Sequence, residues 1–120
     1  MFKLITLIPR RKGTSREQFI DHYENRHVPL IEAHFTQFRR YVRNYPQGAN
    51  LHYAGMVATP DAPFDAVTEH WFDSQADFDA MMAQFAGDPE LARLVAEDEA
   101  RFCDTAGMAM FVADERESGI

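Results

Sequence analysis

The sequence contains one cysteine, few basic residues and no long hydrophobic run, and each shortage excludes a class of protein. The single cysteine, Cys103, rules out an internal disulfide and favours a reducing compartment, so we expect a cytoplasmic protein. Lys and Arg number 12 against 19 Asp and Glu, giving a formal net charge of -7. This charge argues against sequence-independent nucleic-acid binding, which needs a basic surface, and against docking on anionic membranes.

Membrane-spanning segments and cofactor fingerprints are also missing. No apolar run approaches the roughly 20 residues of a membrane-spanning helix. The opening residues, MFKLITLIPRRKG, lack a charged region before their apolar core and a small-residue cleavage site, so no signal peptide is predicted. The sequence has no G-x-G-x-x-G between a strand and a helix and no other nicotinamide or flavin fingerprint. We therefore expect no cofactor and no membrane partner.

The remaining composition is that of an ordinary globular domain. The chain has 120 residues, of which 46% are apolar and 26% are charged. This length fits one domain, 1–120, with a polar tail from about residue 114.

Hydrophobic patterning and turn residues predict the order β-α-β-β-α-α-β. Ser15 and Gln18 form a capping-box pattern that opens the first helix, and Gly87 is expected to stop the second. The predicted strands are 2–8, 38–45, 66–72 and 109–113, and the predicted helices are 16–35 with a disturbance near Pro29, 75–86 and 89–102. This order is typical of the ferredoxin-like, split βαβ arrangement: an α+β fold with a four-stranded antiparallel sheet and helices on one face.

Both faces of the outer strands are apolar. In the first strand Leu4 and Ile8 share one face while Ile5 and Leu7 share the other, and the strand 109–113 behaves similarly. Helices can cover only one face, and a sheet half exposed to water should alternate apolar and polar residues. The simplest cover for the second face is the sheet of another copy, so we predict a homodimer. The alternative is that these short strands are simply hydrophobic.

The stretch FIDHYENRHVPLI, residues 19–31, places a histidine inside an apolar helical stripe. At about 100° per residue, Phe19, Tyr23, His27 and Leu30 fall on one face. Pro29 cannot donate a helical hydrogen bond, so the local helix should bend and open space beside His27. An imidazole there could exchange protons near neutral pH. The alternative is a core histidine that is hydrogen-bonded to the backbone and takes no part in chemistry.

The strand 66–72 must bury an ionisable group whichever way it faces. Glu69 and Trp71 share one face, and His70 lies on the other. A buried carboxylate must be paired, hydrogen-bonded or protonated. Glu69 is therefore either a catalytic base or the partner of Arg43 or Arg40 in an ion pair. His70 either lines the pocket or is a polar group of the dimer interface.

Histidine spacing argues against a metal site. His22 and His27 are five residues apart, about 140° around an α-helix, so they should not converge. His27 and His34 are two turns apart, and there is no H-E-x-x-H and no cysteine cluster. We expect no metal.

The long connection 46–65 carries His52, Tyr53 and Met56. Loops of this length in compact domains are usually functional or disordered. This segment could cap a pocket, or it could be a β-type excursion at the dimer edge.

Two motifs resemble those of EthD-like proteins. The pattern Phe19-x-x-x-Tyr23-x-x-x-His27-x-Pro29-Leu30 resembles the helix motif of this family, and EHWFDSQADF, residues 69–78, resembles its strand-to-helix junction. Tyr41 and Asn44, in RYVRNYP, lie in a similar setting. The resemblance covers nearly the whole chain and implies the dimeric α+β barrel superfamily.

The resemblance and the residues together suggest a cofactor-independent enzyme. It would act on a small, largely apolar, oxygenated compound of aromatic, lactone or polyketide type, by acid–base isomerisation, cyclisation or dehydration, in catabolism or polyketide metabolism. The expected catalytic residues are His27, Tyr23 and Glu69, and the expected substrate-binding residues are Phe19, Leu30, Tyr41, Asn44, His52, His70 and Trp71.

Two other functions stay open on the sequence. One is a non-catalytic accessory protein that holds such a compound for a partner oxygenase. The other is a cofactor-free monooxygenase or haem-handling protein, in which His27 beside Tyr23 would be the axial ligand.

Overall fold

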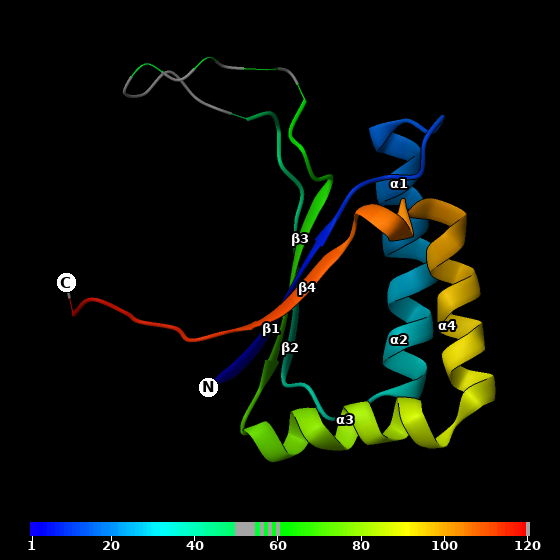
Figure 1. The fold of residues 1–120 in the computed structure, drawn as a ribbon, viewed down its shortest axis with the longest axis vertical. Coiled ribbons are helices and arrows are strands. Elements are labelled where there is room, and N and C mark those ends of the chain that lie inside the picture. Colours follow the sequence, from blue (N-terminus) through cyan, green and yellow to red (C-terminus); the bar gives the residue numbers. More distant parts are fainter. Residues whose placement is uncertain (50–54, 56, 58, 60, 120) are drawn as a thin grey trace.

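A four-stranded antiparallel sheet carries all of the helices on one face (Figure 1). The computed structural model describes residues 1–49, 55, 57, 59 and 61–119. The strands are β1 (Phe2–Ile8), β2 (Arg40–Asn44), β3 (Ala66–Phe72) and β4 (Ala109–Ala113), paired in the order β2-β3-β1-β4. The helices are α1 (Arg16–His22), α2 (Val28–His34), α3 (Gln75–Gly87) and α4 (Pro89–Phe102), with a π-helical turn at Tyr23–His27 and a 3-10 turn at Thr105–Gly107. The predicted α+β, ferredoxin-like class is confirmed.

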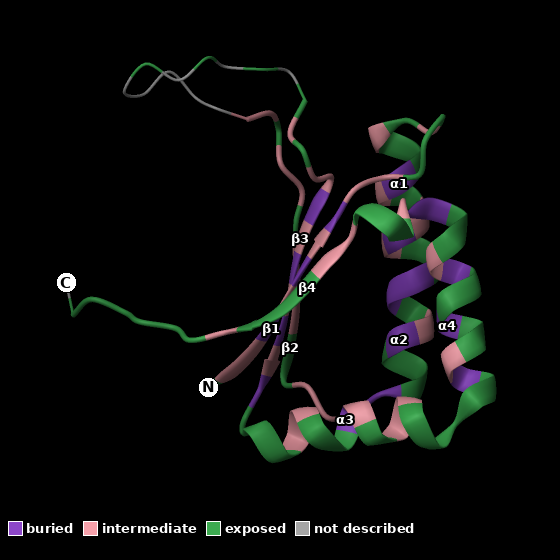
Figure 2. Ribbon diagram, viewed as in Figure 1, coloured by how far each residue is buried: buried purple, intermediate pink, exposed green. Residues whose placement is uncertain are grey.

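Helices α1 and α2 and the π turn between them form one column that lies beside α4. Helix α3 crosses the end of this column (Figure 1). Figure 2 shows that α1, α2, α4, β1 and β3 all carry buried residues. Burial alternates along β3, where Thr68, His70 and Phe72 are buried and Glu69 and Trp71 are only half-buried. This alternation places His70 on the helix side and Glu69 on the opposite face, which the sequence left undecided.

The core consists of two hydrophobic clusters. The first gathers around α2, α3 and the start of α4 and contains Leu4, Ile31, Phe35, Phe72, Met81, Leu91 and Val95. The second gathers around α1 and the end of α4 and contains Ile8, Phe19, Tyr23, Val28, Ala66, Phe102 and Cys103. The buried polar residues are Thr6, His27, Thr68, His70 and Asp98. Thr6 lies between Leu4 and Ile8 on β1, so polar groups separate the two clusters along the sheet.

The disturbance expected near Pro29 is a π-helical turn. The Val28 N–H donates to the carbonyl of Tyr23, five residues earlier, instead of four. Pro29 lies in the first turn of α2, where the N–H that it lacks would have been the donor to the carbonyl of Asn25. The widened turn accommodates this loss without breaking the column. Such π turns recur at functional sites because they redirect the side chains on either side of them.

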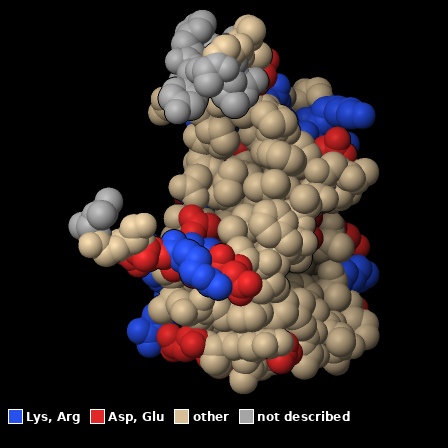
Figure 3. Space-filling view, turned by 60° about the vertical axis from the view of Figure 1, so that its left-hand side comes forward, with Lys and Arg blue, Asp and Glu red and all other residues tan. Residues whose placement is uncertain are grey.

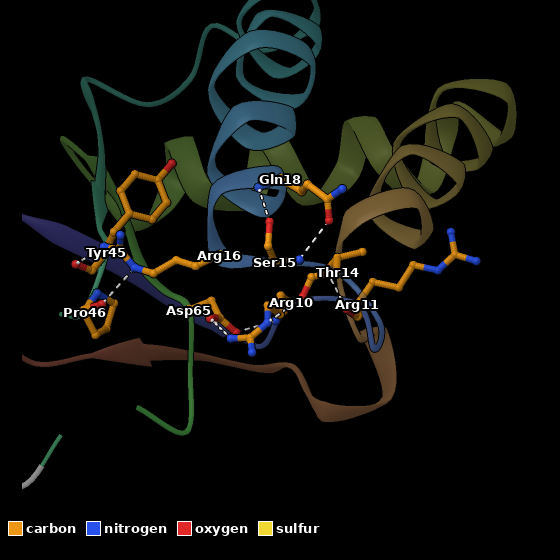
Figure 4. Close-up of polar contacts among 9 residues, drawn as sticks. All are labelled: Arg10, Arg11, Thr14, Ser15, Arg16, Gln18, Tyr45, Pro46 and Asp65. Carbon is orange, nitrogen blue, oxygen red and sulfur yellow. Dashed lines mark hydrogen bonds and ion pairs between the residues drawn. The ribbon is translucent and has the colours of Figure 1, made fainter. Parts of the chain in front are cut away.

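The start of α1 is fixed by the capping box predicted from the sequence (Figure 4). The Ser15 hydroxyl accepts from the Gln18 N–H at 3.1 Å, and the Gln18 side chain accepts from the Ser15 N–H at 2.9 Å. Arg10, just after β1, donates to Asp65, just before β3, at 2.8 Å. These contacts set where α1 begins relative to the sheet, and so where Tyr23 and His27 lie.

Two boundaries differ from those predicted. Strand β2 is shorter than the predicted 38–45, because Phe38 turns into the core and packs against Tyr41 at a centroid distance of 5.6 Å. Gly87, which was predicted to follow the second helix, is the last residue of α3. The Asp88 side chain caps the start of α4 by accepting a hydrogen bond from the Leu91 N–H. The connection after β2 leads away from the two layers and pairs Ala49 with Thr59 (Figure 1). His52, Tyr53 and Met56 lie outside the described residues.

Within the described part of the chain, no helix has the length and apolarity needed to cross a membrane.

Phe72 should be one of the side chains on which the fold depends most. It is fully buried and packs edge-on against Phe78 at 5.6 Å. We expect Phe72→Ala to lower the free energy of unfolding by about 3–5 kcal/mol, because it removes buried apolar surface and leaves a cavity. Urea denaturation at one protein concentration measures the loss. Val112→Ala, at a side chain 46% exposed on β4, is the control and should cost less than about 1 kcal/mol.

Candidate active site

A cavity of about 340 Å³ lies between the sheet and the helices. Its volume is within the range of small-molecule sites, although at the lower end. Met110, on β4, is 58% exposed, which places the opening beside the edge strand. The described residues that line it are Leu4, Thr6, Ile8, Tyr23, His27, Ile31, Tyr41, Thr68, His70, Met81, Met82, Phe85, Ala92, Val95, Glu99, Met108 and Met110.

Asp98 of α4 joins the two histidines on either side of the π turn. Its carboxylate accepts from Nδ1 of His27 at 2.8 Å and from Nε2 of His22 at 3.0 Å. The sequence-based expectation that His22 and His27 do not converge was wrong. It assumed α-helical geometry, whereas in a π turn residues five apart come into line.

This contact fixes the tautomer of His27. A carboxylate can only accept, so Nδ1 of His27 carries the proton and Nε2 is the basic atom of the neutral ring. The hydrogen bond of His27 within the described residues is made by Nδ1, and the side chain lines the cavity. Burial lowers the pKa of His27 below its usual value, and the hydrogen bond to Asp98 opposes that shift. His27 is therefore neutral at pH 7 and able to accept a proton.

Two tyrosine hydroxyls and a threonine hydroxyl form a chain along one wall. Tyr41 donates to the oxygen of Tyr23 at 3.1 Å, and the hydroxyls of Tyr23 and Thr68 share a hydrogen bond of 2.7 Å. The Tyr23 ring lies edge-on to the His27 ring at 5.6 Å. Burial raises the pKa of Tyr23 to about 12 and that of Tyr41 well above its usual value. Both phenols keep their protons at neutral pH and can only donate or accept hydrogen bonds.

His70 is buried without a polar partner. Its side chain stacks on Tyr41 at 4.3 Å and meets Phe38 edge-on at 5.1 Å. Neither ring nitrogen has a hydrogen-bond partner among the described residues. Burial lowers the pKa of His70 to about 4, so the ring is neutral at pH 7. Native proteins pair nearly all of their buried polar atoms, which makes this histidine an exception.

Glu99 is the acidic residue of the cavity wall. It lies on α4, one position after Asp98, and its pKa is raised to about 6, first by burial and then by the neighbouring carboxylate. None of the described lining residues is a lysine or an arginine. The cavity therefore holds neutral hydrogen-bonding groups and one group that becomes an anion near neutral pH.

The structure brings together four of the residues expected from the sequence: Tyr23, His27, Tyr41 and His70 all line the cavity. Phe19 packs behind Tyr23 at a centroid distance of 5.9 Å, and Leu30 packs against the first core cluster. Neither of these two is among the lining residues.

Three other expected site residues lie on the opposite face of the sheet. Asn44 donates to Glu69 at 3.0 Å, and the Trp71 indole donates to it at 3.2 Å. The ion-pair partner of Glu69 is Lys3, at 3.0 Å, and not Arg40 or Arg43. Glu69 thus has no access to the cavity beside His27.

Asp98 and Glu99 were not anticipated. Asp98 lies on the apolar stripe of α4 that also carries Leu91, Val95 and Phe102, and all four side chains are buried. An acidic residue within such a stripe must be paired. That pattern could have identified Asp98 from the sequence, although not its partner.

The described residues contain no group of three or more His, Cys, Asp or Glu side chains that could hold a metal ion. At Asp98, one carboxylate accepts a hydrogen bond from a ring nitrogen of His22 and from one of His27, so these two nitrogens carry protons and cannot bind a metal ion.

Comparison with known proteins identifies a family and several structures of the same fold. The model of the EthD domain matches residues 11–106. An EthD family protein from Bacillus halodurans C-125 superposes with a TM-score of 0.66, at 19% identity over 97% of this chain and 99% of its own. No curated protein matches the chain.

Two further structures share the fold. An EthD-like protein from Ralstonia eutropha JMP134 has a TM-score of 0.59, at 21% identity over 93% of this chain and 86% of its own. A dimeric protein of unknown function with a ferredoxin-like fold, from Bacteroides fragilis, has a TM-score of 0.53, at 14% identity over 95% of both chains.

Replacing His70 should stabilise the protein. We expect His70→Phe to raise the free energy of unfolding at pH 7 by about 1–2 kcal/mol, because it removes unpaired buried nitrogens and keeps the stacking on Tyr41. The gain should grow as the pH falls from 6.5 to 4. Between these pH values the unfolded wild-type chain carries a proton on His70 that the folded chain does not carry. The free energy of unfolding of the wild type therefore falls by about 1.4 kcal/mol per pH unit, and that of the variant does not. Urea denaturation at several pH values measures both effects, and a loss of stability at pH 7 would contradict them.

Proposed function

The chain belongs to the EthD domain family, and from this membership and the geometry of the cavity we propose that it is a cofactor-independent acid–base enzyme. Its substrate is a small, largely apolar, oxygenated compound, and its reaction is an isomerisation, a cyclisation or a dehydration. The observation that carries this proposal is His27, which faces the cavity with its Nδ1 proton held by Asp98.

The first step of the proposed reaction is the removal of a proton from a carbon atom next to a carbonyl group. Nε2 of His27 takes the proton, and the electron pair of the broken C–H bond moves onto the carbonyl oxygen to give an enolate. Asp98 stabilises the imidazolium that forms, because its carboxylate accepts from Nδ1. Burial alone would disfavour that charge, so the carboxylate is what makes the transfer possible.

The tyrosines stabilise the negative charge that develops on the substrate oxygen, through a hydrogen bond that Tyr23 donates. The Tyr23 oxygen already accepts from Tyr41, and when Thr68 also donates to it, the Tyr23 proton is left for the substrate. A preorganised donor in a cavity with little water stabilises an enolate far better than it would in bulk solvent. Tyr23, supported by the hydrogen bond from Tyr41, thus polarises the carbonyl while His27 removes the proton from the neighbouring carbon.

The three candidate reactions differ only in the fate of the enolate. Return of the proton from His27 to a different carbon gives an isomer. Transfer of that proton to a departing hydroxide releases water and completes a dehydration. Attack of the enolate carbon on a second carbonyl of the same molecule closes a ring, and the alkoxide that this leaves takes the proton from His27. The chain's own residues supply each of these proton transfers, so no cofactor enters the proposal.

Hydrogen exchange tests the shared first step without knowledge of the natural substrate. Wild-type protein incubated in D₂O with neutral bicyclic ketones, such as 2-tetralone, should incorporate deuterium next to the carbonyl, followed by NMR. His27→Gln should slow this exchange by about 10²–10⁴-fold, because it removes the base. Asp98→Asn should also slow it and should move its pH dependence, since the imidazolium loses its partner.

His34→Gln is the matched control, because His34 is an exposed histidine on the same helical column, and the rate of exchange should not change. Exchange that persists at the wild-type rate in His27→Gln would refute the role of this residue. Binding of the ketones without any exchange would favour the accessory-protein alternative, and dependence on molecular oxygen would favour a monooxygenase.

We also propose that the protein is a homodimer joined through the free face of its sheet. Ile5 and Phe111 are paired in register on this face, next to Leu7 and Val67. Figure 3 turns this side of the molecule forward and shows a broad uncharged surface with a cluster of acidic and basic side chains in it. The dimeric relative from Bacteroides fragilis supports the proposal. Contact between two copies would cover the apolar side chains.

Neighbouring residues on β4 provide a matched test of the dimer. Phe111 is 44% exposed on the free face, and Val112 is 46% exposed on the helix side. We expect Phe111→Glu to shift the mass measured by light scattering at micromolar concentration from dimer to monomer. Val112→Glu should leave the mass unchanged. A wild-type protein that is monomeric in this measurement would refute the dimer.

A further inference from the structure

His70 has hydrogen-bonding capacity that the protein does not use. A neutral imidazole carries one N–H donor and one nitrogen acceptor, and neither finds a partner among the described residues. The side chain is 9% exposed, so bulk water does not replace the missing partners. The rings of Tyr41 and Phe38 pack against it, and the Tyr41 hydroxyl is already bonded to Tyr23.

The cavity supplies no positive charge at neutral pH. The described lining residues include no lysine or arginine, and His27 and His70 are both neutral. An anion would have to leave water, with no counter-charge to replace its hydration. It would also lie in the same cavity as Glu99, which can ionise near neutral pH. These groups select against a carboxylate or a phosphate.

The rest of the lining is apolar and adaptable. Four methionines, Met81, Met82, Met108 and Met110, come from α3 and β4 and from the residue before β4. Methionine is flexible and polarizable, so such a wall adjusts to different flat or branched shapes. The polar groups Thr6, Thr68, Tyr41 and His70 come from β1, β2 and β3, and Tyr23 and His27 face the same cavity from the helical column. A bound molecule should therefore place its polar end beside these groups and its apolar body among the methionines.

We propose that His70 selects the ligand of this cavity, which is a neutral molecule with an apolar body of about two rings and a hydroxyl group that exchanges a hydrogen bond with the His70 ring. Enols, phenols and hydroxylated cyclic ketones belong to this class. The inference rests on the proposed function only in assuming that the cavity takes a small molecule. It assigns to His70 a role that His27 does not have: His70 binds and does not move a proton.

Three probes of nearly equal shape test the proposal: 2-naphthol, naphthalene and 2-naphthoate. Equilibrium dialysis at pH 7.5 gives the dissociation constant of each. Wild-type protein should bind 2-naphthol about tenfold more tightly than naphthalene, as expected for one buried hydrogen bond to an otherwise unpaired group. It should bind 2-naphthoate at least about 100-fold more weakly than 2-naphthol, because the anion loses its hydration.

Variants of His70 assign the preference to this side chain. His70→Phe should lose about the whole tenfold advantage of 2-naphthol and keep the affinity for naphthalene, because the ring is retained without its nitrogens. His70→Gln keeps one donor and one acceptor and should restore part of the advantage. His34→Phe makes the same substitution at an exposed histidine and should change none of the three constants.

Four results would overturn the inference. They are equal binding of 2-naphthol and naphthalene by the wild type, an unchanged preference in His70→Phe, binding of 2-naphthoate as tight as that of 2-naphthol, and no binding of any probe. His27→Gln separates this inference from the proposed enzyme, since it should slow deuterium exchange by about 10²–10⁴-fold and preserve the preference for 2-naphthol. A wild-type protein that shows the preference but no exchange would support the role of His70 and refute the catalytic one.

Discussion

The site is organised by one carboxylate, that of Asp98, and by the two histidines that share it. The Asp98 carboxylate lies on the same buried stripe of α4 as Leu91, Val95 and Phe102, so it must be neutralised or bonded. His22 and His27 bond it inside the protein, and the exposed Arg101 donates to it at 3.4 Å from the solvent side. They reach it because the π turn aligns residues five apart. The same contact holds α4 against the column of α1 and α2 and sets the orientation of the His27 ring. The fold and the site therefore depend on one another at this point.

The cavity exists because the core does not close over the middle of the sheet. Thr6 and Thr68, neighbours in the register of β1 and β3, occupy inward-facing positions where a close-packed core would have apolar side chains. Phe102 bridges the gap on the helix side, lying 5.0 Å from the His27 ring and 5.3 Å from the Tyr23 ring. The two hydrophobic clusters on either side keep the fold stable, so that the space between them can hold polar groups and a ligand.

The sequence allowed the elements to be predicted well, because each has a local signal. Ser15 and Gln18 show a capping box, Gly87 marks the end of the second helix, and Pro29 indicates the disturbance in the first. The orientation of β3 could not be predicted, since both of its faces carry an ionisable residue and only the packed helices decide between Glu69 and His70. The meeting of His22, His27 and Asp98 could not be predicted either. It joins two elements more than seventy residues apart through a turn whose geometry departs from the α-helix.

His27 and His70 show how one residue type acquires two behaviours in a single cavity. Burial lowers the pKa of both rings, but only at His27 does a carboxylate oppose the shift. His27 can therefore become an imidazolium when a substrate offers a proton, because Asp98 is present to stabilise the charge. His70 has no such partner, and its pKa of about 4 keeps it neutral through any reaction near pH 7. A neutral ring beside a titrating one can hold a substrate hydroxyl without competing for the proton that His27 moves. In this arrangement the difference between binding and catalysis depends on whether an acidic side chain reaches the second nitrogen of the ring.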